Sequence, residues 1–297
     1  MVVLNHLPNK VKFIMELSFP LINQLFPRKG FIGGRIGYSK EEIFKWLLVK
    51  KVTNWDYRSI AQISNISHPT LVRRNRQFEA RNVYRSFFLH LVKKAAALRL
   101  IKGEKVAIDS SFVKTYSNKE EEGSCGFNGH KKAYGFKLHV LIDTATKFPI
   151  ALVITNGLMH DSKLAIPLMK RARYYLKKHG YILADKAYDD TDIIAWIMKR
   201  FQSKAGIPMK KKSRPARGKK NRYGNLLNWR LKAVGRTFKH SLLKLRTEIE
   251  RFFASIKRKF HLGKEQTRGI EAFTRNAYLS LISYALNKFY LVGVRSF

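Results

Sequence analysis

The spacing of apolar residues along the chain changes near residue 100. Before that point apolar positions recur every three or four residues, as in "SKEEIFKWLLVKK", where Ile43, Leu47 and Leu48 share one face. Ser39 stands three residues before Glu42, which is the spacing of a capping box at a helix start. The pattern therefore predicts an all-helical region over residues 1–100.

The stretch "DYRSIAQISNISHPTLVRRNRQF" predicts two short helices, at about 56–63 and 68–79, on either side of "SNIS". Asn65 falls in the turn, and asparagine tolerates the left-handed conformation that such a turn requires. The pair is similar to a helix-turn-helix, whose second helix would present residues that bind phosphates and purine edges: Arg73, Arg74, Asn75 and Arg76. Two ordinary core helices with solvated arginines are the alternative.

After residue 100 the pattern becomes that of a mixed sheet. "EKVAIDSSFVKTY", "YGFKLHVLID" and "FPIALVIT" predict three strands, and a helix follows Asp161, a potential N-cap. "YILA" predicts a buried strand, "DTDIIAWIMKRF" a helix and "AGIPMKKK" one more strand, before two final helices. We therefore expect an α/β fold with helices flanking a mixed sheet over residues 101–297. A basic linker, residues 210–225, would precede the last helices.

Charge narrows the range of partners. Lys and Arg number 59 against 20 Asp and Glu, which gives a net charge of +39. A surface that positive calls for a polyanion, and nucleic acid is the first choice because binding releases counterions. A membrane surface is the second reading, although no long basic amphipathic helix stands apart from a core. A merely basic protein is the third.

Location is indicated by features that the sequence lacks. There is one cysteine, so no intrachain disulfide can form, which fits a reducing compartment. No apolar run reaches the ~18 residues of a membrane span. Lys10 and Lys12 follow the first apolar residues, whereas a signal peptide has its basic residues first. We expect a cytoplasmic protein, located with the DNA in a cell without a nucleus.

Three carboxylates stand in apolar surroundings. Asp109 interrupts "VAID", Asp185 ends "YILAD", and Glu250 borders an apolar helical stripe. The stripe consists of Leu242, Leu245, Ile249, Phe252, Phe253, Ile256 and Phe260. Carboxylates that converge in such surroundings repel each other unless a cation joins them. Mg²⁺ prefers oxygen ligands, and two such ions about 3.5–4 Å apart can cleave a phosphodiester.

Basic residues accompany Glu250 on its helix. Arg246 precedes it by four residues and Lys257 follows it by seven, so all three share one face. Such a column could hold a metal at its centre and DNA phosphates at both ends, or it could be an ordinary helical salt bridge. Spacing alone does not decide between these. Two other acids have simpler readings, with Asp143 as a turn residue and Asp161 as the N-cap.

"VAIDSSFV", "YILADKAY" and "LLKLRTEIERFFASIKRKFHL" together resemble the DDE transposases of prokaryotic insertion sequences. In that family a Tyr, two residues, an Arg, three residues, a Glu, six residues and a Lys follow one another; here these positions read Leu243, Arg246, Glu250 and Lys257. Leu243 occupies the tyrosine position, so the role of that hydroxyl is lost. The resemblance covers about residues 100–290.

The resemblance implies an RNase H-like catalytic domain in which Asp109, Asp185 and Glu250 bind two Mg²⁺ or Mn²⁺ ions. Water would nick the element's end, and the freed 3′-OH would attack target DNA. Arg246 and Lys257 would hold end phosphates, and the N-terminal helices would recognise terminal inverted repeats on double-stranded DNA. A homodimer would pair two ends. Two alternatives remain, namely a catalytically silent DNA-binding protein, such as a repressor, and a nuclease that cuts without rejoining strands.

Overall fold

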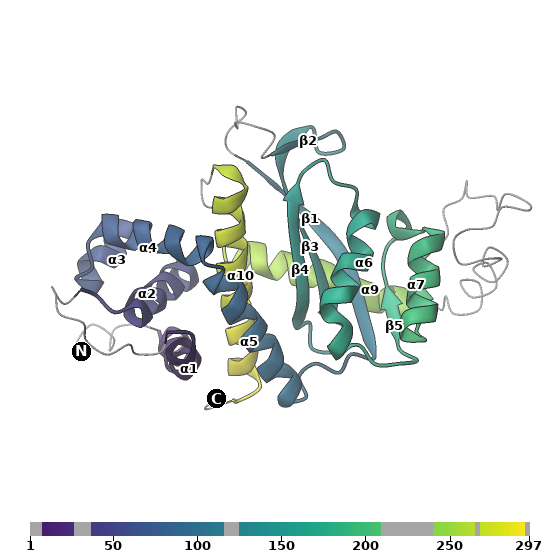
Figure 1. Cartoon of the computed structure of the whole chain (residues 1–297), viewed down its shortest axis with the longest axis horizontal. Helices are drawn as coiled ribbons and strands as arrows, with labels where there is room; N and C mark the ends of the chain where they lie inside the picture. The colour runs from purple at the N-terminus through teal and green to yellow at the C-terminus, as the bar shows by residue number, and fades with distance from the viewer. Residues whose placement is uncertain (1–7, 27–36, 116–124, 209–239, 265–267, 295–297) are drawn as a thin grey trace, which may run out of the picture. The chain divides into compact units, whose positions relative to one another are not determined.

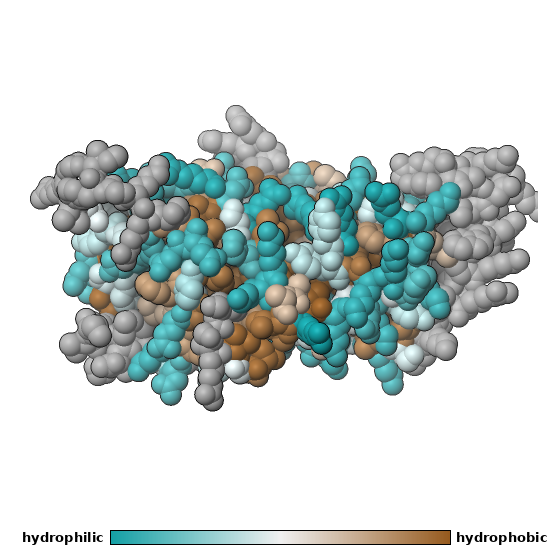
Figure 2. Space-filling model, turned by 60° about the horizontal axis from the view of Figure 1, so that its bottom comes forward, coloured by the Kyte–Doolittle hydropathy of each residue, from teal (hydrophilic) through white to brown (hydrophobic). Residues whose placement is uncertain are grey.

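The computed structural model describes residues 8–26, 37–115, 125–208, 240–264 and 268–294 (Figure 1). The predicted linker at 210–225 lies outside these ranges. The chain forms two compact units, one of residues 1–95 with 255–297 and the other of residues 96–254. Hydrophilic side chains, teal in Figure 2, cover much of the described surface on the face that it presents.

The first unit is helical. Its elements are α1 (Asn9–Leu25), α2 (Lys40–Thr53), α3 (Tyr57–Ser64), α4 (His68–Ala80), most of α5 (Val83–Ala97), the end of α9 (His240–Lys259) and α10 (Gly269–Leu291). Aromatic rings fill its core, with Phe44 packed 5.8 Å from Phe78 and 5.1 Å from Phe87 between centroids. Residues 255–297, which we expected beside the sheet, group here because α10 packs on α1, α2 and α4.

Local sequence signals set the ends of these helices. The Ser39 hydroxyl accepts a hydrogen bond from the Glu42 amide at 3.0 Å, as the capping-box spacing predicts. Asn65 ends α3 in the left-handed region, with φ of 57°. Pro69 lies in the first turn of α4, where the missing N–H costs little. The predicted pair of short helices is therefore confirmed.

The second unit contains a mixed sheet. Its strands are β1 (Lys105–Lys114), β2 (Gly126–Asn128), β3 (Ala133–Asp143), β4 (Pro149–Asn156), β5 (Tyr181–Leu183) and β6 (Lys204–Gly206). The order is β2-β3-β1-β5-β6, with β4 also beside β3. β1 runs antiparallel to β3 and parallel to β5, and β6 is parallel to β5. The expected mixed α/β fold, with helices before and around the sheet, is confirmed.

Helices and short turns lie between these strands or follow the last of them. They are α6 (Asp161–Ala172), the 3₁₀ turn η3 (Arg173–Tyr175), the 3₁₀ turn η4 (Lys186–Tyr188), α7 (Thr191–Phe201) and the first part of α9. α6 packs on β3, β4 and η4, so its first residues lie beside the carboxyl end of β5. The sheet's buried interior includes Ile108, Phe136 and Leu183.

Two acids that could have been ligands have structural surroundings. Asp143 is fully buried and accepts hydrogen bonds from the amides of Lys102, Gly103, Ala145 and Thr146, which confirms its turn role. The prediction that Asp161 is an N-cap is wrong. His160 occupies the N-cap position, and Asp161 is the first helical residue, so the Asp161 side chain does not cap the helix.

Candidate active site

Strand register brings Asp109 and Asp185 together. The parallel pairing of β1 with β5 ends at the pair Ala107 and Leu183. Asp109 lies two residues after Ala107, and Asp185 lies two residues after Leu183. Because the two strands run parallel in this register, the two carboxylates lie near each other at the carboxyl end of the paired segment. Beyond Ala107, β1 continues its pairing with β3, and among the described residues its pairing with β5 has ended. The structure thus joins two of the three predicted acids.

Asp109 occupies a half-buried position in the middle of β1. The pKa of its carboxyl is raised from 3.8 to about 7, chiefly by burial and also by the nearby charge of Asp185. The Ser110 amide, which donates to Oδ1 at 2.8 Å, and the Arg246 guanidinium oppose this shift. A carboxyl so poorly compensated binds either a proton or a cation.

Asp185 caps the turn that follows β5. Its Oδ1 accepts a hydrogen bond from the Ala187 amide at 2.7 Å, which fixes η4 directly after the strand. The carboxylate remains half-buried beside Asp109. One of its oxygens is thus held by the backbone while the other remains available for a cation.

Tyr188 ends the same turn and points a hydroxyl into the carboxylate region. The residue is 1% exposed, and its hydroxyl has no hydrogen-bond partner among the described residues. Burial raises the pKa of this phenol well above 10, and the charges of Asp109, Asp161 and Asp185 add to that effect. The sequence offers no spacing that marks Tyr188, because its position depends on the turn capped by Asp185.

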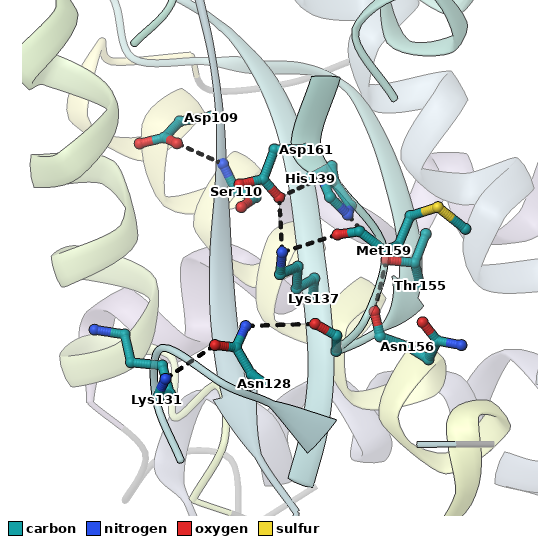
Figure 3. Close-up of polar contacts among 11 residues, drawn as sticks. Asp109, Ser110, Asn128, Lys131, Lys137, His139, Thr155, Asn156, Met159 and Asp161 are labelled. Carbon is teal, nitrogen blue, oxygen red and sulfur yellow. Dashed lines mark hydrogen bonds and ion pairs between the residues drawn. The ribbon is translucent and has the colours of Figure 1, made fainter. Parts of the chain in front are cut away.

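A second polar cluster, which the sequence did not predict, surrounds Asp161 (Figure 3). Lys137 Nζ lies 3.1 Å from Asp161 Oδ1 and donates to the Met159 carbonyl at 2.8 Å. His139 is fully buried, with Nε2 2.9 Å from the Thr155 hydroxyl and Nδ1 3.8 Å from Asp161. Burial lowers the pKa of His139 to about 4, so the ring is neutral at physiological pH.

This cluster adjoins the first pair of acids. The charge of Asp161 raises the pKa of both Asp109 and Tyr188, so its carboxylate lies within electrostatic range of each. Lys137 faces the cluster because it lies two residues from His139 on β3, and alternate residues of a strand share a face. The alternating pattern of β3 was the only sequence signal for this neighbourhood.

Helix α9 carries the third predicted acid. Arg246 Nη2 lies 2.8 Å from Glu250 Oε1, an ion pair in which the Glu250 side chain is 54% exposed. The charge of Arg246 also lowers the pKa of Asp109, so this guanidinium interacts with both Glu250 and the aspartate. Lys257 is half-buried on the same helix but belongs to the other compact unit. The side chain of Leu243 lies outside the described residues.

The predicted apolar stripe of α9 is largely confirmed. Leu242, Ile249, Phe252, Phe253, Ile256 and Phe260 are buried, and Leu245 is half-buried. Within the described ranges, no three side chains among His, Cys, Asp and Glu form a group arranged to hold a metal. Asp109 and Asp185 are paired, whereas Glu250 is engaged with Arg246 at the helix surface.

The predicted DNA-facing helix, α4, exposes part of the expected set. Arg73 and Arg76 are exposed and, with His68 and Val72, line a cavity of about 440 Å³. Arg74 is half-buried and donates to Gln77 at 2.9 Å. The prediction that α4 displays Asn75 is wrong.

Asn75 is buried, and its side-chain amide forms hydrogen bonds with two tyrosines. Its Nδ2 donates to the Tyr57 hydroxyl, and its Oδ1 accepts from the Tyr84 hydroxyl at 2.5 Å. The side chain therefore joins α3, α4 and α5 in the core of the helical unit.

Comparison with known proteins identifies the family. No curated protein matches the chain. Among solved structures, a piggyBac transposase synaptic complex with hairpin DNA is 13% identical, with a TM-score of 0.39, covering 98% of this chain and 81% of its own. A pre-cleavage Mos1 transpososome is 10% identical, with a TM-score of 0.25, covering 95% and 97%. A mariner Mos1 paired-end complex with Mg is 11% identical, with a TM-score of 0.25, covering 92% and 86%.

The sequence match is the stronger finding. Residues 101–286, more than half of the chain, match the profile of a family described as "Transposase DDE domain". The matched segment contains the sheet, the paired aspartates and Glu250. The chain therefore belongs to the DDE transposase domain family.

Proposed function

We propose that the protein cleaves the ends of a mobile DNA element, of the prokaryotic insertion-sequence type, and joins them to target DNA. The observation that carries this proposal is the pairing of Asp109 and Asp185 at the end of the parallel strands β1 and β5. Two carboxylates in a half-buried setting leave a negative charge that a divalent cation neutralises. The net charge of +39 supplies the attraction for DNA.

The donor set fits a divalent metal in its chemistry. Asp109 and Asp185 offer hard carboxylate oxygens, and Mg²⁺ or Mn²⁺, two ions in this proposal, would be held between them. Such ions activate water and stabilise the leaving oxygen of a phosphodiester. Glu250 would complete the ligand set by leaving Arg246, which would then be free to bind a phosphate. The coupling of Arg246 to Asp109 supports this exchange.

The remaining residues would hold DNA. Arg246 and Lys257 bind phosphates at the cleaved end, and the exposed Arg73 and Arg76 of α4, with Arg74 beside them, contact the terminal repeats. Cleavage releases a 3′-OH, which attacks a phosphodiester of the target DNA. One P–O bond forms while another breaks, and the target strand leaves with a 3′-OH of its own. In this proposal the active species is a homodimer, which pairs two ends of the element in one complex.

A catalytically silent DNA-binding protein is the second candidate. It is favoured by one observation, namely that Glu250 is paired with Arg246 and that the described residues contain no three-acid metal group. In that case DNA binding by α4 would persist without strand breakage.

The distinguishing experiment uses purified protein and the DNA segments that flank its coding sequence. With Mg²⁺, the proposal expects nicked ends and strand-transfer products in a target plasmid, and neither product in EDTA. Cleavage without joined products would indicate a nuclease. Binding without cleavage in Mg²⁺ or Mn²⁺ would establish the silent alternative.

A further inference from the structure

A basic cavity opens between the ends of α6 and α7, in the sheet-containing unit. Its volume is about 820 Å³, within the range of ligand pockets. Five cations line it: Lys170, Arg173, Lys178, Lys199 and Arg200. All five are exposed, and no acidic side chain of the described residues lines the cavity. Their mutual repulsion is relieved most directly by a polyanion.

Aromatic rings accompany these cations. Tyr174 is 78% exposed, and the Arg173 guanidinium lies 4.4 Å from the centre of its ring. Trp196 is half-buried in the wall and packs edge-on against Phe201, with ring centroids 4.8 Å apart. Cations with accessible aromatic rings form the combination that binds unpaired nucleotides, since phosphates meet the charges and bases stack on the rings.

Helix electrostatics explain only part of this composition. Cations in a helix's last turn are stabilised by its dipole, which accounts for Lys170, Lys199 and Arg200. Lys178 lies outside both helices, and a tyrosine as exposed as Tyr174 gains nothing from a dipole. A ligand that uses both the charges and the rings explains all of them together.

The cavity is distinct from the acidic site. α6 begins at Asp161, beside the acids, and Arg173 follows its last residue, so about 18 Å of helix separates the two. α7 begins six residues after Asp185 and ends at Phe201, in the cavity wall. Both helices thus run from the acidic site to the cavity, and Figure 1 shows them side by side.

We propose that this basic–aromatic cavity, lined by the five cations with Tyr174 and Trp196, binds a DNA strand with unpaired bases at a distance from the carboxylates. The inference rests on the proposed function in that the polyanion is DNA. It adds a second contact, for a strand outside the cleavage site. Because the two sites are separate, loss of one leaves the other measurable.

The test measures binding of a labelled oligothymidine of about 15 nucleotides, and of a duplex of equal length, by fluorescence anisotropy in EDTA. The first variant is Lys199→Ala with Arg200→Ala. Its matched control, Arg85→Ala with Lys93→Ala, removes the same two residue types from exposed positions of α5. The second variant is Tyr174→Ala, whose exposure makes it harmless to the fold. Thermal unfolding confirms that each variant is folded.

The proposal expects the Lys199/Arg200 variant to bind the single strand more weakly than the control. Its slope of log affinity against log salt should be shallower by about 1.4, since each lost phosphate contact on a single strand removes about 0.7. Tyr174→Ala should bind the single strand at least about fivefold more weakly than wild type, with duplex affinity unchanged.

Two results would overturn the inference. One is equal single-strand affinity for the Lys199/Arg200 variant and its control. The other is a Tyr174→Ala protein that binds single strand as wild type does, or that loses duplex and single strand alike. The cleavage assay reports separately on the proposed function, so a wild-type protein that cleaves DNA while these variants bind normally would refute the cavity alone.

Discussion

Lys137 Nζ and Asp161 Oδ1 lie 3.1 Å apart, which joins the middle of strand β3 to the first residue of helix α6. The lysine side chain is 13% exposed and the aspartate 25%, so water screens the pair only in part. The neutral ring of His139 also lies next to Asp161, with Nδ1 3.8 Å from Oδ1. The pair therefore fixes the start of α6 beside the acidic site.

Breaking this pair should cost more than breaking one at the surface. Lys137→Met leaves Asp161 without its cation, and the free energy of unfolding should fall by about 1–3 kcal/mol. Lys177→Met is the control, because Lys177 and Glu104 are more than half exposed and such pairs contribute less than about 1 kcal/mol. Urea denaturation measures both. Equal losses of unfolding free energy in the two variants would show that the Lys137–Asp161 pair stabilises the fold no more than a surface pair does.

Asp109 makes metal-free stability depend on pH. Its folded pKa, about 7, exceeds the ordinary 3.8, so its stabilising effect is complete below 3.8 and is lost as the pH rises through 7. In EDTA, wild type should lose on the order of 3 kcal/mol relative to Asp109→Asn between pH 4 and 8. Urea denaturation across that range gives the difference, and parallel curves for the two proteins would contradict the raised pKa.

Two tyrosines provide a matched pair of hydroxyl deletions. Tyr188 has a buried hydroxyl without a partner in the described part of the chain, so Tyr188→Phe should leave the free energy of unfolding unchanged or raise it by up to about 1 kcal/mol. Tyr84→Phe deprives the buried Asn75 of a donor and should cost about 1–3 kcal/mol. Chemical denaturation without metal distinguishes them. A large loss in Tyr188→Phe would mean that its hydroxyl is bonded in the folded protein.

The sequence predicted those features that depend on local chemistry. Helix periodicity, the Ser39 cap, the left-handed Asn65 and the strand carrying Asp109 were confirmed because each is set by neighbouring residues. The proximity of Asp109 and Asp185 results from the parallel pairing of the two strands that precede them. Tertiary contacts decided the rest. Asn75 was expected at the surface because arginines surround it, yet Tyr57 and Tyr84, from other helices, bury it. Tyr188 acquires its position only through a turn.

The helical unit offers a test of DNA recognition. Arg73→Ala with Arg76→Ala removes two exposed cations of α4, so affinity for flanking duplex DNA should fall and the salt slope should be shallower by about 1.8. Asn75→Ala should instead lower the melting temperature, because it removes the hydrogen-bond partner of the buried Tyr84 hydroxyl and of the half-buried Tyr57. Anisotropy titrations and thermal unfolding give both results. An unaltered salt slope in the double variant would exclude α4 from the interface.

The most direct test of the account is metal-dependent cleavage by Asp185→Asn beside Asp190→Asn. Asp190 caps α7 through its side chain, and asparagine caps helices equally well, so Asp190→Asn should cleave as wild type does. Asp185→Asn keeps the size of the side chain and removes the charge that pairs with Asp109. The account predicts that cleavage of flanking DNA in Mg²⁺ is abolished in Asp185→Asn while DNA affinity stays the same or rises. An Asp185→Asn protein that cleaves at the wild-type rate would contradict it.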